Sequence, residues 1–290
     1  MNIEEGVKII SVYDNIVDYI LVKQGAKINA VGTPDKPIVM TSEKEEPGAW
    51  GGIHICGKAH TNAEGGKGSS EIGGAVYGGN DDADNSGTLQ YIRLEYTGFA
   101  FDEEHEANGI SFYGVGNGTI VDHCEAYKGS DDGFEFFGGS VNVSNMVVVS
   151  CSDDSFDWTE GWNGKGTDLV AYQEAKATLG YDCDCLIEAD NNENDNAATP
   201  VSHPVLKNLI LAGNGESKQG IRLRRGTQAD HRQCQSMRQG TTAGSGERIN
   251  ECLAEKRYFQ THQYDRHCRI EIRRRLHQRR LHRRNKQQSG

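Results

Sequence analysis

The sequence predicts an all-β protein, a right-handed parallel β-helix whose short strands stack in coils of about 22 residues. The main observation is a repeat. Residues 130–137 read Ser-Asp-Asp-Gly-Phe-Glu-Phe-Phe and residues 152–159 read Ser-Asp-Asp-Ser-Phe-Asp-Trp-Thr, an offset of 22. The same offset pairs residues 147–148, Val-Val, with residues 169–170, Leu-Val. An antiparallel sandwich does not predict matched side chains at one offset, whereas stacked coils do.

Short apolar runs recur along the chain, and each predicts one strand. They are residues 28–31, 38–40, 53–56, 146–149 and 209–211. Gly, Asn and Asp separate these runs, and they turn the chain tightly because they tolerate φ > 0. Residues 87–98 match residues 118–129 at an offset of 31, which predicts one coil with an inserted loop. Residues 1–225 contain no long amphipathic pattern, so a doubly wound α/β fold is excluded.

Charge divides the chain into two parts. Residues 1–225 carry 36 acidic side chains and 16 Lys or Arg, a net charge of −20, whereas residues 226–290 carry +9. An acidic body repels nucleic acid and anionic lipid, so we expect no nucleic-acid partner. No apolar run approaches the ~20 residues of a membrane span. The 8 cysteines show neither zinc spacing nor a disulfide framework and are interpreted as small buried hydrophobic residues.

Several motifs, in order along the chain, resemble a family of exported bacterial β-helix proteins. They are residues 50–59 (Trp-Gly-Gly-Ile-His-Ile-Cys-Gly-Lys-Ala), 77–79, 84–87, 108–110 and 131–139. The family comprises secreted and surface lipoproteins of Bacteroidetes, with relatives among leptospiral outer-membrane lipoproteins. The resemblance covers residues 1–230 and implies a pectin-lyase-like fold. It also implies a location outside the cell or on the outer-membrane surface of a Gram-negative bacterium.

The start of the chain lacks both a signal peptide and a lipid-anchor cysteine. Strand-like sequence begins at once, in residues 1–7, so we expect a truncated N-terminus. The resemblance implies membrane association only through a lipid anchor, which is absent from this chain.

The resemblance ends near residue 230, and we expect two regions, a β-helix over residues 1–230 and a basic irregular tail over residues 231–290. The tail is rich in His, Gln and Arg, with a triple arginine at residues 273–275. A frameshift accounts for it, because reading residues 231–235 in a shifted frame permits Ile-Asp-Asn-Val-Lys, a natural strand entry. A nucleic-acid-binding arm and a disordered tail are the alternatives.

The repeat predicts a ladder of four aspartates: Asp131 near Asp153, and Asp132 near Asp154. Neighbouring strands lie ~4.8 Å apart, so these carboxylates repel each other unless something neutralises them. Three roles remain open. The aspartates cap turns, or bind Ca²⁺ through oxygen ligands, or act as catalytic acid and base. The last role resembles that in β-helix polygalacturonases and calcium-dependent polysaccharide lyases.

Two tryptophans flank the ladder, Trp158 and Trp162. If they face outward they form a stacking platform for sugars, and otherwise they belong to the core. A second acidic segment, residues 188–195, is interpreted as a polar loop and a second candidate cation site.

These observations favour an exported surface β-helix with a non-enzymatic binding or structural role, whose ligands are a polysaccharide or surface glycan and Ca²⁺. The alternative is a polysaccharide lyase or glycoside hydrolase acting at Asp131, Asp132, Asp153 and Asp154. An open groove with a base and exposed aromatic rings would favour the enzyme.

Overall fold

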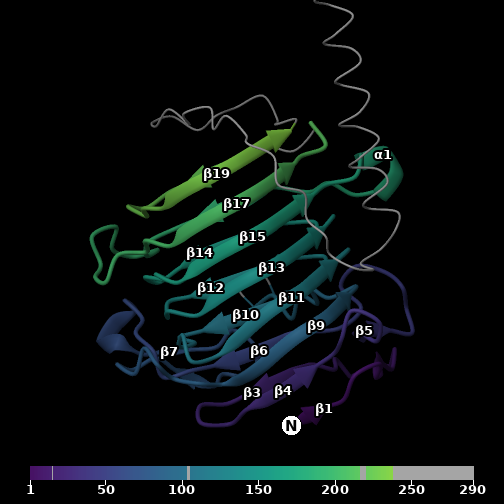
Figure 1. Ribbon diagram of the computed structural model, residues 1–290, viewed down its shortest axis with the longest axis horizontal. Coiled ribbons are helices and arrows are strands. Elements are labelled where there is room, and N and C mark those ends of the chain that lie inside the picture. Colours follow the sequence, from purple (N-terminus) through teal and green to yellow (C-terminus); the bar gives the residue numbers. More distant parts are fainter. Residues whose placement is uncertain (15, 103–104, 216–219, 238–290) are drawn as a thin grey trace, which may run out of the picture.

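The computed structural model describes residues 1–14, 16–102, 105–215 and 220–237. Parallel strands stack coil upon coil from the N-terminal end upward (Figure 1). The strands of the larger, ten-stranded sheet are β1 (Asn2–Ile3), β2 (Lys8–Ser11), β4 (Ile28–Val31), β5 (Ile38–Ser42), β9 (Gly87–Glu95), β11 (Ile120–Tyr127), β13 (Asn142–Val149), β15 (Lys165–Tyr172), β17 (Val205–Ala212) and β19 (Asp230–Met237).

A second parallel sheet lies opposite the first and consists of β3 (Ile20–Val22), β6 (Ile53–Cys56), β10 (Ile110–Tyr113), β12 (Phe134–Phe137) and β14 (Phe156–Thr159). The pair β16 (Ile187–Ala189) and β18 (Ile221–Leu223) continues this wall. The N–H of Asp190 donates to the carbonyl of Trp158, which places β16 beside β14. Four short elements lie outside the coils. They are η1 (Glu64–Gly66), the antiparallel pair β7 (Gly68–Ser69) and β8 (Val76–Tyr77), and α1 (Lys176–Leu179).

Each long strand of the larger sheet bends once, at the same register position. The residues there have φ between 51° and 61°, in the left-handed region, and are Tyr91, His123, Asn145, Asp168, Asn208 and Gln233. Burial alternates along the strand but skips one step at the bend, as between Val143 and Met146. The larger sheet therefore forms two faces, and the smaller sheet completes a three-sided coil around one core.

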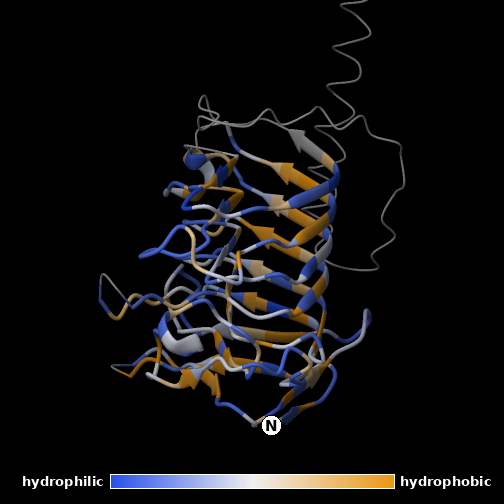
Figure 2. Ribbon diagram, turned by 90° about the vertical axis from the view of Figure 1, so that its left-hand side faces the viewer, coloured by the Kyte–Doolittle hydropathy of each residue, from blue (hydrophilic) through white to orange (hydrophobic). Residues whose placement is uncertain are grey.

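The inward side chains stack in columns along the axis. Phe134 pairs with Phe156 at the predicted offset of 22, and their ring centroids lie 5.9 Å apart. Trp158 and Trp162 are each 1% exposed, and Trp162 stacks on Phe136 at 4.1 Å. These tryptophans therefore do not form the outward-facing platform for sugars considered above. Trp158 on β14 and Trp162 in the turn after it both point inward, and the core buries both rings. Figure 2 shows the apolar strands stacked along the solenoid.

Two predicted registers are wrong by one residue. Leu169 pairs with Met146 rather than Val147, because the turn after β14 holds one residue more than the turn after β12. Strands β9 and β11 pair at an offset of 32 rather than 31, which brings Leu89 opposite Val121. Both residues are buried, and a one-residue slip would turn them outward. The prediction of buried cysteines is confirmed, since five of the six described are buried and all six are free.

The solenoid continues past residue 230. Strand β19 pairs with β17 in parallel register, with Cys234 opposite Leu209. The expected irregular structure from residue 231 on is therefore wrong for residues 231–237. His231 and Arg232 are exposed at this end of the solenoid, while the backbone extends the sheet. Residues 238–290, with the arginine-rich part of the tail, lie outside the described residues. Over the described residues, no helix is both long enough and apolar enough to cross a membrane.

Candidate functional site

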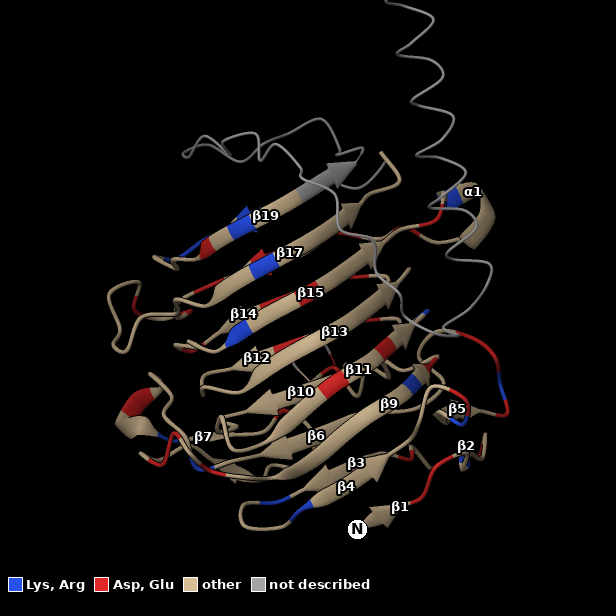
Figure 3. Ribbon diagram, in the orientation of Figure 1, with Lys and Arg blue, Asp and Glu red and all other residues tan. Residues whose placement is uncertain are grey.

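Carboxylates line the outer surface of the smaller sheet. Ser111, Glu135 and Asp157 occupy equivalent outward positions on β10, β12 and β14. Glu188 on β16 lies beside Asp157, and oxygens of both fall within one acidic group. Figure 3 shows acidic residues spread over the described coils. Because equivalent positions stack one strand apart, the parallel register forces these side chains together.

Two of the four predicted aspartates cap turns. Asp132 Oδ1 accepts the backbone N–H of Asp154 at 2.8 Å, and Asp154 Oδ1 accepts that of Cys185 at 2.5 Å. Asn108 Oδ1 does the same for the N–H of Asp132 at 3.1 Å, one coil earlier. The turn-capping role thus holds for Asp132 and Asp154. Each still has a second carboxylate oxygen that the cap does not use.

The other two predicted aspartates lie at the rim of the same surface. Asp131 is buried and Asp153 is exposed, and their carboxylates lie within 4.8 Å of each other and of Asp132. Asp131 and Asp153 therefore lie side by side, as the repeat predicts. Asp132 also lies beside Asp154, as predicted, through the hydrogen bond to its backbone N–H, while the Asp154 carboxylate belongs to neighbouring groups. The structure thus shows carboxylates that cap turns and also gather closely enough to share one cation.

A group that the sequence did not single out lies at the centre of this surface. Asp132, Glu135 and Asp157 offer oxygens within 4.8 Å of one another. Asn108 Nδ2 donates to Glu135 Oε2 at 2.6 Å, but Asp157 Oδ1 is buried without a hydrogen-bond partner. A buried, unpaired carboxylate oxygen is costly, so this atom calls for a proton or a cation. The strand alternation of residues 134–137 and 156–159 was the signal that could have identified Glu135 and Asp157.

Burial governs the protonation of this surface. Desolvation raises the pKa of Asp132, Glu135 and Asp157 well above the ordinary carboxyl range, and neighbouring negative charges raise it further. Desolvation likewise raises the pKa of Asp154 to about 8, with Asp153 adding to the effect. Burial therefore favours the protonated form of these groups when no cation is bound, whereas a bound cation would favour the charged form.

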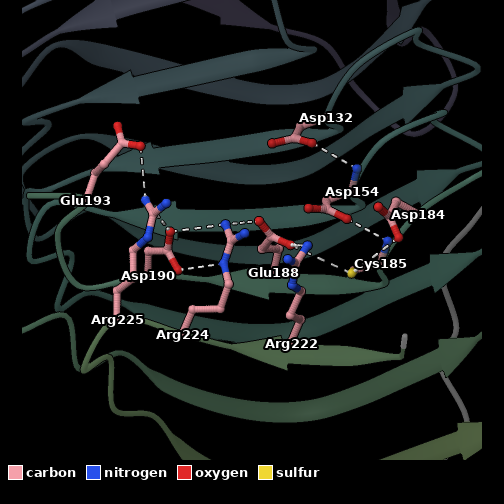
Figure 4. A network of polar contacts seen from close by, with 10 residues as sticks. All are labelled: Asp132, Asp154, Asp184, Cys185, Glu188, Asp190, Glu193, Arg222, Arg224 and Arg225. Carbon is pink, nitrogen blue, oxygen red and sulfur yellow. Dashed lines mark hydrogen bonds and ion pairs between the residues drawn. The ribbon is translucent and has the colours of Figure 1, made fainter. Parts of the chain in front are cut away.

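Arginines neutralise the C-terminal end of the surface. Arg222 Nη1 lies 2.7 Å from Glu188 Oε1, and Arg224 Nε lies 2.9 Å from Asp190 Oδ1 (Figure 4). Arg225 pairs with Asp190 as well. The second candidate cation site, residues 188–195, is thus largely satisfied by protein cations at Glu188 and Asp190. The sequence did not reveal this because Arg222 on β18 and Arg224 in the turn after it each lie 34 residues beyond their partners.

The ion pairs limit what these arginines can do. In the described residues beside the acidic surface, Arg222, Arg224 and Arg225 all pair with carboxylates. Interactions with Asp190 and Glu188 raise the pKa of Arg224 despite the opposing effect of burial. A guanidinium held in this way is a poor proton acceptor, so these three arginines are poor candidates for the base of a lyase.

Stacked coils, an internal core and an acidic outer wall define a parallel β-helix protein. The chain belongs to the pectate-lyase-like β-helix domain family, whose model matches residues 1–264. The match passes residue 230, where the resemblance in motifs was expected to end. Comparisons with curated proteins and with solved structures found no match. Membership gives the fold, while the chemistry must be argued from the site.

Proposed function

We propose that this β-helix is a non-enzymatic, calcium-binding protein in which Asp132, Glu135 and Asp157 hold the ion. The observation that carries the proposal is the buried Asp157 Oδ1, which has no hydrogen-bond partner and lies in a group of three carboxylates. Carboxylate oxygens are the ligands that Ca²⁺ prefers. Each of the three carboxylates offers one oxygen to the group, and water molecules would complete the 6–8 oxygens that the ion takes. Asp131 and Asp153 extend the negative field at the rim.

The group of Asp132, Glu135 and Asp157 calls for a bound metal ion because the arginines neutralise other carboxylates. Arg222 and Arg224 pair with Glu188 and Asp190, at the C-terminal end of the acidic surface. Extracellular calcium modules work with Kd values of roughly 10⁻⁴–10⁻³ M, a range that a partly solvated carboxylate group can reach. The ion would offset both the burial and the mutual repulsion that otherwise favour the protonated form of these carboxyl groups.

We further propose that the protein is an exported surface protein of a Gram-negative bacterium, related to Bacteroidetes lipoproteins, with a polysaccharide or surface glycan as partner. The motifs of residues 50–59 and 131–139 support the location. The buried Trp158 and Trp162 leave the glycan without the platform first considered. Binding to a panel of neutral and uronate polysaccharides, with and without Ca²⁺, tests the partner, and product release on that panel would support the enzyme instead.

The calcium site is tested by thermal unfolding in Ca²⁺ and in EGTA. A ligand that binds only the folded state at a hundred times its Kd stabilises it by about 2.7 kcal/mol, so the melting temperature should rise. Asp157→Asn and Glu135→Gln should abolish the rise. Asp35→Asn is the matched control, since Asp35 is exposed in a turn near the N-terminal end. An identical melting temperature of the unaltered protein in both buffers would rule the site out.

A further inference from the structure

A long insertion between β6 and β9 departs from the coil pattern. Its middle, residues 64–79, contains η1, β7 and β8, and Glu71 of this part accepts a hydrogen bond from the Tyr113 hydroxyl at 3.3 Å. We call the first arm of the insertion, residues 57–62, the strap. Its hydrogen bonds, described below, show that the strap runs along the axis of the solenoid, across the coils rather than within one of them.

The backbone of the strap meets one coil after another. The strap starts directly after β6, whose neighbour in the smaller sheet is β10. The carbonyl of His60 accepts the N–H of Gly139, in the turn after β12, at 2.7 Å. The N–H of Asn62 donates to the carbonyl of Glu160, in the turn after β14, at 2.9 Å. Because β6, β10, β12 and β14 are successive strands of the smaller sheet, the strap crosses all of their coils.

A buried cluster of amides fixes the far end of the strap. Asn62 Nδ2 donates to Asn191 Oδ1 at 2.9 Å, and Asn192 Nδ2 donates to Asn62 Oδ1 at 2.9 Å. Both partners follow β16, so these bonds reach one coil further, 129 and 130 residues along the chain. Asn62 Nδ2 also donates to the carbonyl of Pro200 at 3.0 Å. The three asparagines are at most 9% exposed, so a lost bond would leave a buried polar group without its partner.

The returning arm of the insertion fastens the middle of the strap. Asp82 Oδ1 accepts the backbone N–H of His60 at 3.1 Å and lies 2.6 Å from His60 Nδ1. The backbone carbonyl of Asp82 accepts the Asn117 N–H at 2.8 Å and the Ser140 hydroxyl at 2.7 Å. Asn117 follows β10 and Ser140 follows β12, so Asp82 ties the strap to two successive coils.

Glycines in the coils make room for the strap. Gly138 and Gly161, in the turns after β12 and β14, have φ of 63° and 87°. A Cβ on Gly138 would lie 2.8 Å from the carbonyl oxygen of His60, and one on Gly161 would lie 3.3 Å from Asn62 Nδ2. A larger residue at Gly138 would therefore push the strap away, in addition to straining the left-handed backbone.

We propose that the strap couples the coils from β6 to β16, so that the coil of β16 opens only when residues 57–62 release it. In a solenoid each repeat contacts only its neighbours, and the coils near an end open by themselves. The strap adds bonds between coils that are not neighbours. Strands β16 and β18 have only three residues each, so their coils gain most from such a tie. The proposal is independent of the calcium site, because the contacts that carry it do not involve the three carboxylates of that site.

Backbone hydrogen exchange of the full chain, followed by mass spectrometry, tests the coupling. Asp82→Ala removes the oxygen that holds His60 but leaves the Asn62 side chain with its own partners. If the strap transmits this loosening, the amides of residues 187–192 should exchange about tenfold faster, in line with the loss of one hydrogen bond. Asp82→Asn keeps an oxygen at the same position and should exchange like the unaltered chain.

Two further variants complete the test. Asn62→Ala breaks the strap at its far end and should speed exchange at residues 187–192 at least as much. Asn142→Ala is the matched control, because Asn142 Oδ1 accepts the N–H of Lys165 at 3.0 Å, a bond between neighbouring coils, so its effect should stay in β13 and β15.

A response to Asn62→Ala but not to Asp82→Ala would mean that Asn62 acts only on its direct partners, and this would overturn the coupling. Unchanged exchange at residues 187–192 in both variants would overturn it as well. An equal speed-up in Asn142→Ala would show general loosening of the solenoid and would also count against the strap. If Asn62→Ala does not fold, the comparison of Asp82→Ala with Asp82→Asn decides the matter.

Discussion

Asp132 accepts the backbone N–H of Asp154 on its Oδ1 atom at 2.8 Å, one coil further along the solenoid. Asn108 serves the same backbone role for Asp132 in the preceding coil. An amide oxygen therefore suffices to accept this backbone N–H, so the fold does not require the charge of Asp132. The negative charge is surplus to the structural role, which is consistent with a cation ligand.

The two roles of Asp132 can be separated with a pair of variants. Asp132→Asn keeps the capping oxygen and should fold normally, but it should lose most of the stabilisation by Ca²⁺. Asp132→Ala also leaves the Asp154 N–H without its partner, so it should be about 1–3 kcal/mol less stable than Asp132→Asn. Urea unfolding in EGTA measures this difference. Equal stability of the two variants would show that the hydrogen bond from the Asp154 N–H to residue 132 does not stabilise the folded state.

Stability should depend on pH in a direction set by the raised pKa values. The pKa of Asp154 is about 8 and that of Glu71 about 7 in the folded protein, against about 4 when unfolded. The folded state therefore binds more protons, and its stability is greatest below about pH 4 as far as these groups are concerned. In EGTA that contribution should be lost progressively up to about pH 8.

Calcium should flatten this profile, because the ion offsets the charges that appear as the pH rises. Melting temperatures measured across the range in EGTA and in saturating Ca²⁺ give the two curves. Glu71→Gln should reduce the slope in EGTA, whereas Asp35→Asn should leave it unchanged. A slope of opposite sign in EGTA would mean that these carboxyl groups are charged and paired in the folded protein.

The left-handed bend in the larger sheet gives a prediction at Asn145. Its φ is 54°, and its Nδ2 donates to Asp122 Oδ1 at 2.8 Å in the preceding coil. Asn145→Gly should lose only the hydrogen bond, about 1 kcal/mol. Asn145→Ala should lose about 1–2 kcal/mol more, since a Cβ penalises left-handed backbone. Denaturant unfolding of both variants checks the order, and a more stable alanine variant would contradict it.

The same bend supports the frameshift hypothesis for the tail. In the shifted frame, residues 231–235 permit Ile-Asp-Asn-Val-Lys, and the asparagine falls at residue 233, where φ is 60°. That position pairs with Asn208, and residues 231 and 234 pair with the buried Leu206 and Leu209. The shifted frame thus permits apolar residues at positions 231 and 234, which pair with buried leucines. It permits asparagine at position 233, where β19 bends.

We therefore expect the combined variant His231→Ile, Gln233→Asn and Cys234→Val to melt at a higher temperature than the unaltered chain. Relief of left-handed strain and added apolar burial should contribute about 1–3 kcal/mol together. Sequencing the source DNA provides the direct check, and an intact reading frame through codon 231 would contradict the hypothesis.

Much of the fold could be read from local sequence. The repeat of residues 130–137 and 152–159 predicted the parallel stacking and the contact of Phe134 with Phe156, because neighbouring coils of equal length place matched residues opposite each other. The repeat also located Asp131 and Asp132 beside the next coil. The predicted register was wrong by one residue between β13 and β15. The turn before β15 holds one added residue, and similar apolar side chains match at either offset, so the sequence repeat did not reveal the shift.

The sequence by itself determined the fold class, the coil spacing and the acidic character of the wall, because these follow from local periodicity and composition. Only the tertiary structure decided which groups meet across distant segments. It turned Trp158 inward and brought Arg224, in the turn after β18, to Asp190. It also brought Glu71 within hydrogen-bond distance of Tyr113 on β10. The last two contacts depend on segments of unequal length between strands, and the geometry of such a segment is determined by what it packs against rather than by its own sequence pattern.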